Sequence, residues 1–165
     1  MSAIALTHAA LSAQPSDAKS TLSDRFLLAQ VQTLTLVIPA LWVVEIFRVE
    51  RSQILALPFY SPLLIGITHH GGRVLPLLSS HTLLNAPSTS LRENTMVVKL
   101  GDAAGSLAQV GIVIDHPLGS QTRAEIPSAV FADAPQSPND SIVLLRPEWV
   151  SADLWQPLCW IPSGL

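Results

Sequence analysis

Proline and glycine repeatedly interrupt the apolar runs between Ile54 and Leu84, and this pattern constrains the fold more than any other feature of the sequence. Leu57 and Ser61 each precede a proline, which restricts both residues to extended backbone geometry. The short apolar run from Leu63 to Ile65 then ends at Gly66. Such a run, bounded by a turn residue, is typical of a buried strand.

The same segment contains a second strand after a tight turn. Gly71 and Gly72 are adjacent and adopt positive φ readily, and residues 73–78 resume an extended apolar run. The pattern therefore predicts a strand, a turn and a returning strand. Pro76 lacks the N–H group that a sheet ladder needs, so we expect it at a sheet edge or at a bulge.

Similar short runs, separated by turn residues, continue along the chain. The sequence predicts further strands at residues 33–38, 41–49, 95–100, 107–115, 141–145 and 158–161. Residues 95–115 resemble an antiparallel hairpin with a longer loop, and Pro147 to Leu154 fits one or two helical turns. No stretch beyond the N-terminal tail has sustained helical periodicity, so the predicted fold class is all-β, a barrel or a sandwich.

The segment from Phe26 to Val44 has no charged residue and permits two interpretations. It has the length of a membrane-spanning helix, which would make the protein a membrane-associated structural protein anchored through residues 26–44. Against this, apolar and polar side chains alternate from Thr33 to Ile38, as in a strand, and Pro39 follows. We expect two strands here, with a turn at Pro39.

Composition excludes several classes of function. The net charge is −3, and lysine occurs only at Lys19 and Lys99, so no basic surface for nucleic acid is expected. The single cysteine, Cys159, excludes a disulfide framework and is expected to be a buried thiol in a cytoplasmic protein. The N-terminus lacks the basic start of a secretory signal, so no cleaved leader is expected.

Two constellations of polar residues could carry chemistry, and both lack a necessary part. His69, His70 and His81 could bind a metal ion with Asp115 or His116, but adjacent side chains on a strand point to opposite faces. Asp115 and His116 could act in a hydrolase, but no nucleophile is recognisable beside them. We therefore expect no catalytic residue, no metal and no cofactor, and the protein is predicted not to be an enzyme.

Three stretches in order carry a resemblance to a known family. They are Leu41 to Val49 with its Val-x-Glu-Ile run, the proline- and glycine-rich residues 57–77, and Gly111 to Asp115. In this order they resemble the CheW-like domains, the coupling proteins of bacterial chemosensory systems. The resemblance covers residues 29–165, with residues 1–28 as a flexible tail. It implies two small five-stranded SH3-like barrels that share an apolar core.

The resemblance also implies a function and a site. It implies a non-enzymatic adaptor that couples a chemoreceptor tip to the regulatory domain of a CheA-type histidine kinase, at membrane receptor arrays and without membrane insertion. The turn that usually reads Asn-Leu-Arg-Gly here holds His69, His70, Gly71 and Gly72, so the chain is a divergent member, suited to a pilus-based or other non-flagellar pathway. The partner-binding residues that it implies are Gly66, His70, Gly71, Gly72, Arg73 and Pro76.

Overall fold

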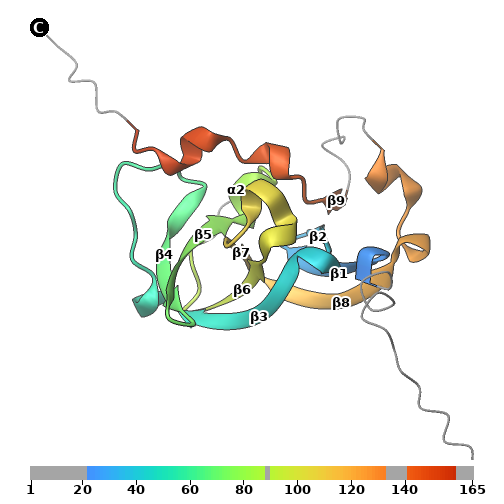
Figure 1. Ribbon diagram of the computed structural model, residues 1–165, viewed down its shortest axis with the longest axis horizontal. Helices are drawn as coiled ribbons and strands as arrows, with labels where there is room; N and C mark the ends of the chain where they lie inside the picture. Colours follow the sequence, from blue (N-terminus) through green and yellow to red (C-terminus); the bar gives the residue numbers. More distant parts are fainter. Residues whose placement is uncertain (1–21, 88–89, 133–140, 159–165) are drawn as a thin grey trace, which may run out of the picture.

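Two curled sheets make up the computed structural model, which describes residues 22–87, 90–132 and 141–158 (Figure 1). In spatial order, the five-stranded sheet contains β3 (Val43–Glu50), β6 (Asn94–Leu100), β7 (Gly111–Ile114), β5 (Arg73–Ser79) and β4 (Leu64–His70). The four-stranded sheet contains β8 (His116–Thr122), β1 (Arg25–Val31), β2 (Leu34–Pro39) and β9 (Ile142–Leu144).

The helical segments of the described residues are all short. They are η1 (Ala40–Trp42), η2 (Arg51–Gln53), α2 (Ser80–Leu83), η3 (Asp102–Leu107), η4 (Arg123–Glu125), η5 (Ser128–Phe131), η6 (Pro147–Trp149) and η7 (Ala152–Trp155). None of them is long and apolar enough to cross a bilayer. The all-β class predicted from the sequence is therefore confirmed.

Three clusters of buried side chains explain why the two sheets stay together. The largest cluster combines residues of both sheets, for example Leu36 and Ile38 of β2 with Val98 and Ile112 of the other sheet. A second cluster lies with the four-stranded sheet, around Val37, and a third belongs to the five-stranded sheet. Two sheets with separate interiors and one common core match the expected pair of barrels sharing an apolar core.

The uncharged segment 26–44 forms β1, β2, η1 and the start of β3, so the interpretation as a membrane helix is wrong. Side chains of β2 alternate between the shared core, which takes Leu36 and Ile38, and the interior of the four-stranded sheet, which takes Val37. Because both faces of the strand are buried, neither face tolerates a charge.

The strands of this segment pair differently from a simple meander. β2 pairs with β1 and, in parallel, with β9, whereas β3 joins the other sheet. β1 was not predicted, and it begins at Arg25, before the expected domain start at residue 29. Its only local signal is the apolar run of residues 26–29, which fits a buried helix as well as a strand.

The central hairpin forms as predicted, with a longer first strand. β4 continues past Gly66 to His70, and β5 returns from Arg73. β5 lies inside its sheet, between β4 and β7, but its ladder with β7 involves only Leu77 to Ser79. Pro76 therefore lies where β5 lacks a partner on that side, and the ladder with β4 is irregular between Leu64 and Gly66.

The remaining predictions have mixed outcomes. β6 and β7 form the expected antiparallel hairpin, β9 lies within residues 141–145, and η6 and η7 provide the helical turns. Within the described residues the second sheet has four strands where five were expected. Most of the expected strand 158–161, Cys159 and most of the tail lie outside the described residues.

Candidate functional site

The turn between β4 and β5 has the geometry that the two glycines predict. Gly71 and Gly72 have φ values of +57° and +77°, and both are exposed. Positive φ at both central residues is the type I′ arrangement, which matches the natural twist of a two-residue hairpin. A β-carbon at either position would meet no atom within 4 Å, so the backbone conformation alone favours glycine here.

His70, the last residue of β4, contacts the opposite edge of its own sheet. Its ring stacks on Phe47 of β3 with centroids 3.7 Å apart, and its Nε2 lies 2.9 Å from Oε1 of Glu45. β3 and β4 are the two edge strands in the sheet order, so these contacts bring the edges together. The five-stranded sheet is thus curled into a barrel, and His70 lies on its seam.

Lys99 of β6 completes this cluster, since its Nζ donates to Oε1 of Glu45 at 3.2 Å. The Lys99 ammonium first and the His70 ring second hold the pKa of the Glu45 carboxyl below its ordinary value of 4.5. Glu45 is therefore a carboxylate at neutral pH and can bind both neighbours. Of these four residues, only His70 was predicted from the sequence as part of the site; Phe47, Glu45 and Lys99 were not.

Gly66 belongs to the same seam, deeper in the barrel. Leu55 forms an isolated bridge to Ile67 on β4, with N···O distances of 2.8 and 2.9 Å in the two directions. A β-carbon on Gly66 would lie 2.9 Å from the Leu55 carbonyl carbon and would overlap its oxygen. Gly66 is buried, so its role in the structure is to let the chain after β3 approach β4.

The outward face beside the seam is apolar. Val44 and Ile46 of β3 are 58% and 37% exposed, and Val74 of β5 is 64% exposed. Val74 pairs with His69, which also points outward, and Arg73 is exposed next to the turn. We call Val44, Ile46, His69 and Val74 the seam face. The sequence alone does not identify its β3 part, because apolar residues occur on both faces of residues 43–48.

The residues considered for a hydrolase or a metal site do not form either site in the structure. Asp115 lies 3.3 Å from His81 and accepts from the Gln32 backbone N–H at 2.6 Å, whereas His116 is exposed. Asp115 therefore pairs with His81 and not with His116. Within the described part of the chain, no group of three histidine, cysteine or acidic side chains is arranged to hold a metal ion.

Comparison with known families identifies the chain. A sequence model of the CheW-like domain matches residues 25–136, which is more than half of the protein. The chain belongs to the CheW-like domain family. The match starts at the first residue of β1 and runs past the end of η5, so it includes every strand of the two sheets except β9. The resemblance seen in three short stretches therefore extends over most of the fold.

Among solved structures, this CheW-like chain is similar to the scaffolding protein TtCheW from Thermoanaerobacter tengcongensis. The two share 13% identity with a TM-score of 0.49, over 61% of this chain and 65% of TtCheW. The match thus spans just under two thirds of that protein's length. A comparison with curated proteins gives no match.

Proposed function

We propose that this CheW-like protein is a non-enzymatic adaptor of a bacterial chemosensory system, which couples a chemoreceptor tip to the regulatory domain of a CheA-type histidine kinase. The observation that carries the proposal is the seam face together with the neighbouring turn. Exposed apolar side chains collect there on two strands of one barrel, and a protein partner would bury them.

Polar groups next to the seam face would give the contact its specificity. Arg73 is exposed beside the turn, and no ion pair engages it among the described residues. We propose that Arg73 supplies the cation that related chains place two positions earlier, where this chain has Gly71. His70, Gly71, Gly72 and Pro76 would shape this surface, and Gly66 would support it from within the barrel.

A binding assay with both partner classes tests the proposal. The purified protein is titrated with kinase regulatory domains and with receptor-tip fragments from the same organism. We expect saturable binding to both classes, and we expect Ile46→Lys to weaken at least one contact by about tenfold or more, because a charge would be desolvated in an apolar interface. Leu118→Lys is the control, since Leu118 is a similarly exposed residue on β8 of the other sheet.

Arg73→Gln separates the roles of charge and shape within this site. If the arginine contacts a partner carboxylate, this variant should lower the association rate and reduce the salt dependence of binding. Failure to retain either partner class would overturn the adaptor function. Binding that Ile46→Lys and Arg73→Gln leave unchanged, while Leu118→Lys weakens it, would move the docking surface to the other barrel.

The proposal includes a cellular location and a pathway. An adaptor of this kind would work in the cytoplasm and be recruited to receptor arrays through its partners. We propose a pilus-based or other non-flagellar pathway, because the turn departs from the usual sequence. Imaging of a fluorescent fusion in cells with and without the receptors tests the location, and twitching and swimming assays of a deletion strain test the pathway.

A further inference from the structure

A cavity of about 280 Å³ lies at the end of the five-stranded barrel that is opposite the turn. β5 connects the two places, because Arg73 flanks the turn and Ser79 lines the cavity. A strand of that length extends about 20 Å, at roughly 3.3 Å per residue. The cavity is therefore a different feature from the proposed partner-binding surface.

The apolar part of the cavity comes mainly from the five-stranded barrel and from the loop before β6. Ile65, Met96, Val113 and Ile114 are at least half-buried, and Leu91 closes the wall from the loop. These side chains already pack against the shared core or the barrel interior. They provide a surface against which the apolar body of a ligand can lie.

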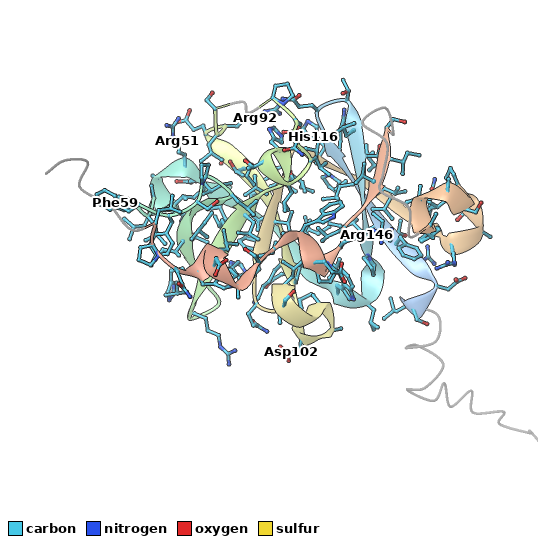
Figure 2. The ribbon with its side chains drawn as sticks, turned by 90° about the horizontal axis from the view of Figure 1, so that it is seen from above. Arg51, Phe59, Arg92, Asp102, His116 and Arg146 are labelled. Carbon is cyan, nitrogen blue, oxygen red and sulfur yellow. The ribbon has the colours of Figure 1, made fainter. Side chains whose placement is uncertain are left out.

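The polar part of the cavity contains two arginines among uncharged serine, threonine and asparagine side chains. Arg48 and Arg92 line it, both are exposed, and neither forms an ion pair in the part of the chain that the structure describes. His116 lines the same cavity, and Figure 2 shows Arg92 and His116 on one side of the molecule. A guanidinium group binds a carboxylate through two parallel hydrogen bonds, so these arginines suit an anion.

The one carboxylate in the lining does not neutralise the two arginines. Its Oδ2 accepts from the Gln32 backbone N–H at 2.6 Å and lies 3.3 Å from Nε2 of His81, so Asp115 is held by groups of both sheets. The two arginines outnumber this one carboxylate, so the lining keeps an excess of positive charge beside an apolar wall. That combination is complementary to an anionic group carried on an apolar body.

We propose that this cavity is a binding site for a carboxylate attached to a small apolar group, with Arg48 and Arg92 holding the carboxylate. The apolar group lies against Met96 and Ile114. The cavity is near the lower size limit of small-molecule sites, about 300 Å³, so it accepts a compact acid. The same chemistry is found in a free aromatic acid and in a glutamate next to an aromatic residue of a bound peptide.

The test uses matched pairs of acid and neutral amide. The protein is titrated with 4-phenylbutyrate and 4-phenylbutanamide, and with a blocked Phe-Glu dipeptide and its Phe-Gln counterpart. The methyl resonances of Ile65, Met96 and Ile114 report binding. We expect saturable shifts with at least one acid and about tenfold weaker binding of its amide, because hydrogen bonds to charged groups are the stronger ones. The pairs need no protein variant, so a folding defect cannot explain the difference.

Two protein variants then test which arginines bind the carboxylate. The double substitution Arg48→Gln with Arg92→Gln should weaken acid binding by about tenfold or more. Arg123→Gln should leave it unchanged, because Arg123 is an exposed arginine of η4, after β8 of the other sheet, and is not in the cavity lining. Binding of the dipeptide alone would identify a peptide as the source of the acid. Any of three results would overturn the proposed site. They are the absence of saturable shifts, equal binding of an acid and its amide, and acid binding that the double substitution does not weaken.

Discussion

A side chain at residue 66 would collide with the segment that closes the five-stranded barrel. Gly66→Ala places its β-carbon against the Leu55 carbonyl, and backbone atoms cannot move aside as a flexible side chain can. We expect this variant to lose about 1–3 kcal/mol of unfolding free energy, as overpacked core positions do, in urea titrations followed by circular dichroism.

Gly72→Ala is the matched control for that measurement. Gly72 also has positive φ, but a β-carbon there meets no atom within 4 Å. Gly72→Ala should therefore lose only about 1 kcal/mol of unfolding free energy, which is the cost of placing alanine at positive φ. Equal losses at the two positions would contradict a steric role for Gly66.

The Glu45 cluster should make stability depend on pH in the acid range. Lys99 and His70 lower the pKa of Glu45 in the folded protein below 4.5. The stabilisation from its charge is therefore complete above the unfolded-state pKa and is lost as the pH falls through the folded-state pKa. Glu45→Gln should flatten the dependence of the urea midpoint on pH between about pH 5 and pH 3.

Glu148→Gln provides the reference for this experiment, because Glu148 is an exposed glutamate outside the cluster. Its pH profile should follow the unmodified protein. If Glu45→Gln also follows the unmodified profile, the contacts of Glu45 with Lys99 and His70 contribute nothing to folding in solution.

Residues of the candidate site were predictable only where local geometry required them. Two adjacent glycines define a tight turn wherever they occur, so Gly71 and Gly72 were identified correctly as its centre. The contact of His70 with Phe47 and Glu45 depends on the closure of the barrel, which brings together residues more than twenty positions apart. No local pattern contains that information.

The strand β2 contributes to two cores, because one of its faces packs in the shared core and the other packs in the interior of the four-stranded sheet. Leu36 is fully buried in the shared core. Leu36→Ala should therefore lower the free energy of unfolding by about 2–5 kcal/mol, because apolar burial is lost and a cavity remains. Leu41→Ala, at a leucine that is 40% exposed, should cost less than about 1 kcal/mol. Chemical denaturation of both variants measures the difference, and comparable losses would contradict the two-core packing.

The same two-sided burial explains which element predictions failed. A strand buried on both faces has a continuous apolar run, so segment 26–44 resembled a membrane helix in composition. β2 was recognised because Thr33 and Thr35 break that run. β1 was missed, because its residues 26–29 are apolar without a break. The pairing of β2 with β9 joins residues about a hundred positions apart, which the order of runs does not reveal.

For the whole molecule, the shared core predicts a single unfolding transition. Side chains of both sheets contact one another in that core, and Trp42 and Trp149 pack against it. Tryptophan fluorescence and far-ultraviolet circular dichroism should therefore give the same urea midpoint. Leu36→Ala in one sheet and Leu78→Ala in the other should each shift both signals together. Two separated transitions would show that the barrels unfold independently.

The overall architecture was predictable at two levels. The short runs with turn residues were sufficient for the all-β class. The division into two barrels came from the resemblance to CheW-like domains, because composition and spacing do not distinguish a sandwich from paired barrels. The cavity near Arg48 and Arg92 was not predicted at all, since its lining comes from strands β3 to β8, from α2 and from the loop before β6, which only the folded chain brings together.

The order in which the four-stranded sheet receives its strands has a consequence for synthesis on the ribosome. β1 and β2 precede the other described strands, yet their outer neighbours are β8 and β9. The backbone N–H of Leu145 can donate to the Val37 carbonyl only after the 108 residues that follow Val37 have been translated. Until then, the nascent hairpin exposes two unpaired edges and two apolar faces. A growing chain of this kind is a natural client for ribosome-associated chaperones, and its cellular yield should fall when they are depleted.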